Sequence, residues 1–335
     1  MGGARRVLID GRGGISSIKV VEAETRAPEP DEVRIRTLAS GIGFADVMAA
    51  HGGYPLAPRG TFTPGYDLAG RVEACGADVA DLEEGRLVVA LNPQFGCQAD
   101  AVCMKAELVV PVNEDADPAQ AVALVLNYLT AHCLVHRKAD LTGGETVLVH
   151  AAAGGVGTAL LQLGRRLNLT MYGTASRAKH DVVRELGGIP IDYRSEDFVE
   201  VIRREHPHGI DAAFDPFGGE NLRRSYDVVG RGGRVVSYGF AGDSFGGRAE
   251  MIKGLLRMAW LNAWPDGKRV SLCATPDEVR KNNAWYRETL SGLVRMLEAG
   301  EVQPVIGARV PLAEAAEGYR RVAEGSVTGK VVLIH

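Results

Sequence analysis

The residues best suited to chemistry form a run of small side chains, His150-Ala-Ala-Ala-Gly-Gly-Val-Gly157, between two apolar segments. Residues 146–150 have the pattern of a buried strand, and residues 156–167 have the pattern of an apolar helix. Small residues at a strand-to-helix turn let the backbone approach a phosphate, which the first helical amides then bind. We therefore predict that a dinucleotide pyrophosphate is bound by Ala153, Gly154, Gly155, Val156 and Gly157. The glycines would equally suit a turn that only needs close helix packing.

The second predicted strand lacks the acidic residue that holds the ribose 2′-hydroxyl in NAD-specific units, about 20 residues beyond the glycine turn. Ser176, Arg177 and Lys179 stand there instead. A hydroxyl and two cations suit a 2′-phosphate, which the planar Arg fork can bind through two hydrogen bonds. The sequence therefore favours NADPH over NADH, although these cations would also suit the solvated start of the next helix.

Further strands end in residues that a parallel sheet would bring to the same edge, where ligands bind. The segments are Asp215-Pro-Phe-Gly-Gly219 and Val236-Ser-Tyr-Gly-Phe240. They predict additional cofactor contacts by Phe217, Gly218, Tyr238, Gly239 and Phe240. Tyr193, after the third strand, either flanks the adenine or packs as an ordinary tyrosine.

The elements that must position these residues divide the chain into two kinds of structure. Up to residue 124, short β-rich runs broken by Gly and Pro predict a barrel-like β domain, with strands at 6–10, 18–24, 32–38, 68–75, 87–91 and 108–112. Asp117 and Pro118 then suit the N-cap and first position of a helix. To about residue 262, strands alternate with helices, which predicts a doubly wound parallel sheet.

The last part of the chain predicts helices at 283–299 and 312–323 and a strand at 330–334. We expect this tail to return to the first domain, so that the active site lies in a cleft between the two. The predicted domains are therefore residues 1–124 with 265–335, and residues 125–264.

Composition excludes several classes of protein. The 335 residues are 46% hydrophobic and 24% charged, with a net charge of −4 and no run of like charge, which disfavours nucleic acid as a partner. Five irregularly spaced cysteines fit reduced thiols, and no signal-peptide segment opens the chain, so we expect a cytoplasmic protein. The apolar stretch 251–264 is too short to span a bilayer and predicts a packed or dimer-facing helix, with surface membrane contact as the alternative.

Several motifs together resemble the quinone oxidoreductase branch of the medium-chain dehydrogenase/reductases. They are the glycine turn, Ala39-Ser-Gly-Ile-Gly-Phe-Ala-Asp46, Gly53-Tyr-Pro55, Thr63-Pro-Gly-Tyr-Asp-Leu-Ala-Gly70 and Gly329-Lys-Val-Val-Leu333. Asn127-Tyr-Leu-Thr-Ala131 and Gly173-Thr-Ala-Ser-Arg-Ala-Lys-His180 are closest to the vesicle amine transport protein subgroup, and zeta-crystallin and polyketide enoyl-reductase domains are similar.

The resemblance implies an α/β protein with a GroES-like catalytic domain, a Rossmann domain that binds NADPH, and a homodimer. It implies reduction of a quinone or an activated carbon–carbon double bond, and it places Lys330 at the cofactor. One departure is Gly43, where the family commonly has Asn before Phe44-x-Asp46. If that Asn contacts nicotinamide or substrate, this chain has lost the contact.

The cysteine pattern argues against the zinc sites of other members of the superfamily. Cys97 and Cys103 lack the short CxxC pairing of structural zinc, and neither they nor Cys75 and His51 form a ligand set. We therefore predict a zinc-free enzyme. A zinc alcohol dehydrogenase is the less favoured alternative, and stoichiometric zinc in the purified protein would revive it.

Without zinc, side-chain donors must stabilise the enolate or phenolate that hydride addition creates. Tyr54 is the first candidate, although it could simply pack on Pro55. The other candidates are Asp46, with a structural or orienting role, and Asn127 and Thr130, which could reach the nicotinamide amide or the substrate. The competing hypothesis is a catalytically silent NADPH-binding interaction or regulatory protein of the same fold.

Overall fold

The computed structural model describes residues 3–11, 13–239 and 247–335, and the chain divides into two compact units. Unit 1 consists of Met1–Leu129 and Thr275–His335, and unit 2 of Thr130–Ala274. The predicted boundaries were 124/125 and 264/265. The expected α/β fold class is confirmed, with a β-rich unit and a parallel-sheet unit.

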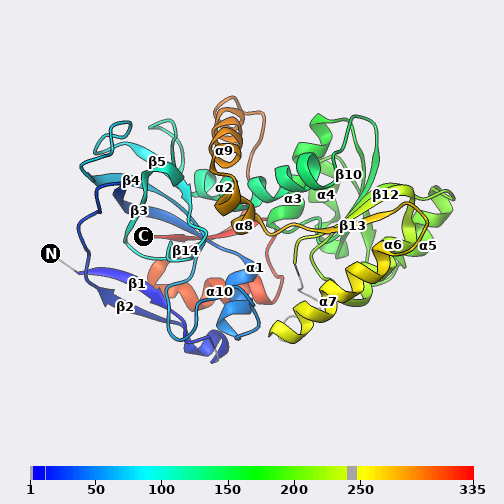
Figure 1. Cartoon of the computed structure of the whole chain (residues 1–335), viewed down its shortest axis with the longest axis horizontal. Coiled ribbons are helices and arrows are strands. Elements are labelled where there is room, and N and C mark those ends of the chain that lie inside the picture. The colour runs from blue at the N-terminus through cyan, green and yellow to red at the C-terminus, as the bar shows by residue number, and fades with distance from the viewer. Residues whose placement is uncertain (1–2, 12, 240–246) are drawn as a thin grey trace. The chain divides into compact units, whose positions relative to one another are not determined.

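Unit 1 is built mainly on antiparallel strands, with β14 parallel to β15 (Figure 1). Within the described residues its larger sheet has the order β14-β15-β3-β4-β5-β7, with β6 also paired to β3, while β1 and β2 form a separate pair. The strands are β1 (Ala4–Leu8), β2 (Lys19–Ala23), β3 (Glu32–Ile42), β4 (Asp67–Cys75), β5 (Leu87–Leu91), β6 (Ala101–Lys105), β7 (Val109–Pro111), β14 (Ile306–Pro311) and β15 (Lys330–Ile334). As expected, the C-terminal strand returns to this unit, where β15 pairs antiparallel with β3.

The helices of unit 1 cover the sheet and join its strands. They are α1 (Phe44–Ala50), the first part of α2 (Pro118–His132), α8 (Thr275–Lys281), α9 (Asn283–Glu298) and α10 (Ala315–Ala323). Helix α2 begins as predicted, because Asp117 accepts a hydrogen bond from the Ala119 amide and Pro118 needs no donor of its own at the first position. Helix α10 packs on β15 through one apolar cluster that includes Tyr319 and Leu333.

Unit 2 has a parallel sheet in the order β10-β9-β8-β11-β12-β13. Its strands are β8 (Thr146–Val149), β9 (Thr170–Ala175), β10 (Gly188–Asp192), β11 (Ile210–Asp215), β12 (Val229–Ser237) and β13 (Arg269–Leu272). Its helices are α3 (Gly155–Arg166), α4 (His180–Glu185), α5 (Phe198–Glu205), α6 (Gly219–Val228) and α7 (Gly247–Asn262). The strand order reverses between β8 and β11, which is where such sheets bind ligands.

Three helices share one apolar face of this sheet. Phe198 of α5, Leu222 of α6 and Leu261 of α7 belong to one buried cluster with Ile210 and Val270 of the strands. Figure 1 shows α6 and α7 running along the same side of the sheet. This packing anchors the sheet whose carboxyl edge carries the predicted cofactor residues.

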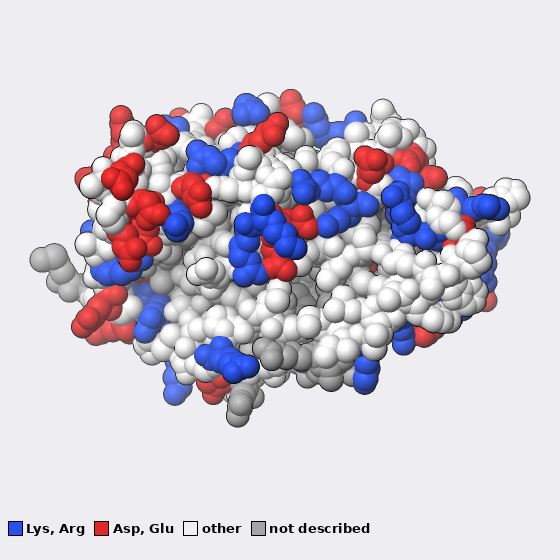
Figure 2. Space-filling view, viewed as in Figure 1, with Lys and Arg blue, Asp and Glu red and all other residues white. Residues whose placement is uncertain are grey.

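Helix α7 also has an apolar face that the rest of unit 2 leaves exposed. Met258 and Leu261 face the core, whereas the outward stripe consists of Ile252, Leu255, Leu256, Ala259 and Trp260, and the exposed Ala263 and Trp264 follow directly after the helix. These positions follow the helical spacing of i, i+3, i+4 and i+7. In Figure 2 the surface over α7 is largely white, with few charged side chains. The helix therefore has two apolar faces and only one is covered.

Among the residues that the structure describes, one helix is long and apolar enough, by length and composition alone, to cross a membrane. It is the 21-residue segment Pro118–Lys138, in which α2 continues as a π-helix over Cys133–Lys138, with a mean hydropathy of 1.3. Because 78% of its most apolar window is buried inside the protein, it has the character of a core helix. The expected lack of a membrane span stays a prediction.

Some elements differ from the predicted ones. The sequence prediction gave no bounds for α1, α6, α8, β6 or β13, and β12 starts at Val229 where the prediction began at residue 234. Ile210 pairs with Val229 across a bulge, so the strand runs through a glycine-rich stretch that has the composition of a turn. These are short elements, and their formation depends on pairing with distant parts of the chain.

Candidate functional site

The glycine turn of unit 2 has the geometry of a phosphate-binding turn. Ala151 adopts a left-handed conformation (φ 51°), and its carbonyl accepts a hydrogen bond of 2.8 Å from the Gly154 amide. Gly154 is the N-cap of α3, so Gly155, Val156 and Gly157 form its first turn. A Cβ on Gly157 would lie 2.3 Å from the Ala151 carbonyl oxygen, so a larger residue cannot fit without moving the turn. The first amides of the helix have no partner within it and can bind an anion.

The end of β9 carries the residues predicted for a 2′-phosphate. Ser176 caps a short 3-10 helix over Arg177–Lys179, and its carbonyl accepts a hydrogen bond of 2.8 Å from the Lys179 amide. Arg177 is exposed, and within the described part of the chain it makes no ion pair. Lys179 is half-buried, and burial lowers the pKa of its amine. This edge can therefore offer a hydroxyl and an uncompensated guanidinium to a phosphate.

The end of β11 forms a second turn, which a buried carboxylate organises. Asp215 has no exposed surface and accepts hydrogen bonds from the amides of Phe217 (2.6 Å) and Gly218 (2.9 Å) and from the Asn221 amide group (2.9 Å). Gly218 has a φ of 71°, a conformation that favours glycine. The carboxylate thus fixes the position of the predicted Phe217–Gly218 contact. Sequence reasoning placed Asp215 at the strand end but missed this role.

The end of β12 lies beside these turns. The Tyr238 amide donates to the Asp215 carbonyl (2.9 Å), and the Tyr238 hydroxyl lies 3.4 Å from the His150 carbonyl. A Cβ on Gly239 would lie 2.7 Å from the Pro216 carbonyl oxygen, so a glycine is needed there. Phe240 lies outside the described residues. Tyr193 follows β10 and is 56% exposed, with the guanidinium of Arg194 5.8 Å from its ring centroid, so much of the ring is open to a planar ligand.

Taken by itself, unit 2 fits a dinucleotide that carries a 2′-phosphate. The close backbone approach at Gly157, the free helix N-terminus, and the exposed Arg177 in place of an acid all lie at carboxyl ends of neighbouring strands. The donor set is that of a phosphate site, since it consists of backbone amides, a hydroxyl and a cation.

Unit 1 holds Tyr54 in an aromatic cluster. The ring of Tyr54 meets those of Tyr66 and Phe95 edge-on, with centroids 6.4 Å and 5.9 Å apart. Burial raises the pKa of the Tyr54 phenol, so the hydroxyl keeps its proton at neutral pH. Phe95 has a φ of 69°, an unusual conformation for a bulky residue that is often found near functional sites. The cluster supports Tyr54 as a hydrogen-bond donor, whereas packing on Pro55 alone would not need a buried hydroxyl.

Asp46 joins the start of α1 to the loop before β4. Its two carboxyl oxygens accept hydrogen bonds of 2.8 Å from the Gly43 and Gly65 amides, so it caps α1 and ties it to the loop before β4. The residue is buried, and burial raises the pKa of its carboxyl to about 6. A Cβ on Gly43 would meet nothing closer than 3.5 Å, so the backbone at this position does not itself require glycine.

The remaining predicted residues are buried. Asn127 in unit 1 and Thr130 in unit 2 both lie on α2. Lys330 of β15 forms a buried ion pair of 2.8 Å with Asp67 of β4 in unit 1, so its amine neutralises a carboxylate on the other side of the intervening strand β3. Asp46 and Tyr54 thus lie in the loop and helix region around Tyr66 in unit 1, whereas the predicted cofactor residues of unit 2 lie at the strand ends and Thr130 lies apart from them on α2.

Among the described residues, no three His, Cys, Asp or Glu side chains converge as a metal site. The five cysteines, including Cys97 and Cys103, are free thiols. His51 hydrogen-bonds through Nδ1 to the Val47 carbonyl at 2.9 Å, at the end of α1.

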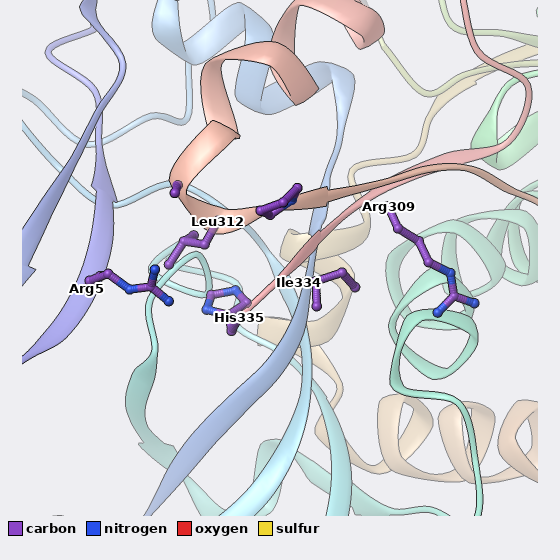
Figure 3. A pocket seen from close by; sticks show the side chains of 7 residues that line it. Arg5, Arg309, Leu312, Ile334 and His335 are labelled. Atoms are coloured by element: carbon purple, nitrogen blue, oxygen red, sulfur yellow. The ribbon is translucent and has the colours of Figure 1, made fainter. Parts of the chain in front are cut away.

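A cavity of about 460 Å³ in unit 1 lies apart from the predicted residues (Figure 3). Figure 3 shows Arg5 and His335 near each other in its wall. Both side chains bind Asp100, at 2.9 Å and 3.1 Å, and Arg309 pairs with Asp117. Its charged groups are therefore already neutralised, and none of the predicted site residues lines it.

Two family models match the chain. Residues 29–114 match an alcohol dehydrogenase GroES-like domain, and residues 188–333 match a domain described as zinc-binding dehydrogenase. The synaptic vesicle membrane protein VAT-1 homolog of Rattus norvegicus is 33% identical over 345 residues, which cover 98% of this chain and 84% of the relative.

Solved structures agree with the observed fold. A quinone oxidoreductase of Pseudomonas syringae has a TM-score of 0.87 and 28% identity, with 99% of this chain and 100% of the other covered. The Escherichia coli quinone oxidoreductase, solved in complex with NADPH, has a TM-score of 0.88 and 23% identity, with 99% and 100% covered.

Proposed function

Since this chain belongs to the medium-chain dehydrogenase/reductase superfamily, in the quinone oxidoreductase branch near the VAT-1 homologues, we propose that it is an NADPH-dependent reductase. Its acceptor would be a quinone or an activated carbon–carbon double bond, reduced without zinc. The observation that carries the proposal is the strand edge of unit 2, where a phosphate-binding turn is followed by Ser176 and the unpaired Arg177 in place of an acid.

In this proposal, the residues of unit 2 hold the cofactor. The first amides of α3 bind the pyrophosphate, while Ser176 and Arg177 bind the 2′-phosphate. The turn that Asp215 holds in place would contact the nicotinamide end of the cofactor through Phe217 and Gly218. When bound, NADPH supplies the hydride. The structure of the strand ends supports these roles because each group lies at the carboxyl edge of the sheet.

In unit 1, Tyr54 would act on the substrate. Its hydroxyl accepts a hydrogen bond from Tyr66 and so has its own proton left to donate. A donor aimed at the oxygen of the developing enolate or phenolate stabilises that charge in the transition state. Asp46 would keep α1 and the loop around Gly65 in place.

The direct test is to mix the purified protein with NADPH or NADH and a panel of acceptors, such as 1,4-benzoquinone, an α,β-unsaturated ketone and an enoyl thioester. We expect oxidation of NADPH in preference to NADH, and the same rate after dialysis against a chelator. NADPH binding without oxidation by any acceptor would instead favour the silent regulatory protein, and loss of activity with the chelator would favour a zinc enzyme.

We also propose that the protein is a cytoplasmic homodimer, and that the exposed face of α7 contributes to the contact. An apolar stripe on an exposed helix favours association, since large exposed apolar patches are uncommon on monomers. Helix α7 packs beside β13, which ends the strand order of the sheet, so the stripe and a sheet edge lie together. A vesicle membrane or a regulatory partner is the alternative occupant of this face.

A further inference from the structure

His150, the residue directly before the glycine turn, is fully enclosed and uses both ring nitrogens. Its side chain is 2% exposed, with Nδ1 3.2 Å from the Thr174 hydroxyl and Nε2 3.0 Å from the Ser225 hydroxyl. Thr174 lies near the end of β9 and Ser225 lies on α6, so one ring links two other elements of unit 2 to the end of β8. Sequence reasoning included His150 in the turn but gave it no role.

The donor and acceptor of each of these hydrogen bonds can be assigned from what the Ser225 hydroxyl binds next. The Ser225 hydroxyl donates to the Asp215 carboxylate at 3.2 Å, so it must accept from Nε2 of the histidine. In a neutral ring Nδ1 is then the acceptor, and the Thr174 hydroxyl donates a hydrogen bond to it. Burial lowers the pKa of the imidazole, which agrees with the neutral ring. The geometry therefore selects one tautomer.

This series of hydrogen bonds, from Thr174 through His150 and Ser225 to Asp215, begins and ends at the two turns of the candidate cofactor site. At one end, the Ala151 amide donates to the Thr174 hydroxyl at 3.3 Å. At the other, Asp215 accepts from the amides of Phe217 and Gly218. Ala151 needs such support because a residue other than glycine with a φ of 51° is strained, and strained backbone persists only where its surroundings fix it.

We infer that His150 is a positioning residue for the cofactor: through Thr174 it holds Ala151 and the pyrophosphate turn, and through Ser225 it joins that turn to the Asp215 turn. This inference rests on the proposed NADPH site. It predicts that replacing the histidine changes the affinity for the dinucleotide, although the ring itself would touch no phosphate. The affinity for a ligand bound only at Ser176 and Arg177 should not change.

The test measures dissociation constants by fluorescence titration for NADPH and for adenosine 2′-monophosphate, which lacks the pyrophosphate. Replacing His150 by Leu leaves the Thr174 hydroxyl without its acceptor, so NADPH binding should weaken about tenfold while the monophosphate binds as before. His150→Asn can keep an acceptor near the position of Nδ1 and should stay within about threefold of the wild type. The matched control is His206→Leu, which removes an imidazole bonded to the Tyr172 hydroxyl in the same unit.

Three results separate the possibilities. Wild-type protein that binds no NADPH would overturn the proposed function. If the wild type binds NADPH, two results for His150→Leu would overturn the positioning role. One is an unchanged dissociation constant for NADPH, and the other is a dissociation constant for the monophosphate that rises by the same factor as that for NADPH. If the Leu variant does not fold, Thr174→Val removes the same link by a change of similar shape, and unaltered NADPH binding in that variant would contradict the inference.

Discussion

The hydroxyl of Tyr66 donates a hydrogen bond to the hydroxyl of Tyr54, with 3.2 Å between the two oxygens. The direction of this bond matters, because it leaves the proton of Tyr54 for another acceptor. Burial raises the pKa of both phenols, so the pair stays neutral at physiological pH.

Replacing Tyr54 by Phe should therefore reduce the turnover rate by about tenfold to a hundredfold, as expected when one donor to a transition-state oxyanion is lost. The melting temperature should change little, since the ring contacts with Phe95 remain. Steady-state kinetics with a quinone acceptor and NADPH measures the effect. Tyr66→Phe is the control, with a smaller loss, and equal activity of Tyr54→Phe and wild type would remove Tyr54 from the mechanism.

Arg177 should determine the preference for a phosphorylated ribose. Its replacement by Ala removes a charge-assisted contact and should weaken NADPH binding by about tenfold or more, with NADH binding unchanged. Titration with both dinucleotides measures the change. Arg184→Ala is a suitable control because that side chain is also exposed but pairs with Asp181 on α4. Equal weakening by both variants would mean that only the general positive charge counts.

Gly157 should tolerate no side chain. In Gly157→Ala the new methyl group would lie 2.3 Å from a carbonyl oxygen, so the turn must move, and we expect loss of NADPH binding together with a lower melting temperature. The comparison is Gly292→Ala in helix α9, where the nearest atom is the end of the Arg295 side chain at 3.8 Å. That change should stabilise the protein by up to about 1 kcal/mol through helix propensity. A Gly157→Ala variant with wild-type affinity would contradict the observed turn.

Asp46 should make the protein less stable as the pH rises. Its carboxyl has a pKa of about 6 in the folded protein and an ordinary value of 3.8, so folding favours the protonated form. The contribution of this carboxyl to the free energy of unfolding is greatest below pH 3.8. It falls by about 3 kcal/mol in total as the pH rises to about 6. Urea unfolding across this range should show the decline in the wild type. In Asp46→Asn the decline should be smaller, and an identical pH dependence in the two proteins would refute the assignment.

The exposed face of α7 should control self-association. Leu256 is 66% exposed and Trp260 is 48% exposed, so exchanging both for Glu should leave unit 2 folded and convert a dimer to a monomer. Light scattering after size-exclusion chromatography gives the mass. Ile189→Glu, which alters an exposed apolar residue on β10, serves as the control. A wild-type protein that is already monomeric would leave the face to another partner, and binding to vesicles of anionic lipid would then be the next measurement.

The sequence predicted the parts of the site that depend on local pattern. The glycine turn, strand β8, helix α3 and the position of Ser176 and Arg177 follow from small residues at fixed spacing between apolar segments. Strand β15 has the bounds that the sequence predicted, residues 330–334. Hydrophobic periodicity acts within a few residues, so a single sequence displays it directly.

The links between distant residues could not be predicted in this way. His150 reaches Ser225 across 75 positions, and Lys330 reaches Asp67 across 263. Nothing in the sequence near Lys330 distinguishes a buried partner for a carboxylate from a cofactor contact. Strand β6 depends in the same manner on β3, because its five residues form a strand only where Glu32–Arg36 offers a ladder.

The two segments that build unit 1 have a consequence for how the protein is made. Strand β15 lies between β3 and β14, whereas unit 2 is formed entirely by residues 130–274. Domains fold as units while the chain is synthesised. Unit 2 can therefore fold during synthesis before β15 has been made, and until then the β3 edge of unit 1 presents unpaired backbone groups to which another chain could pair.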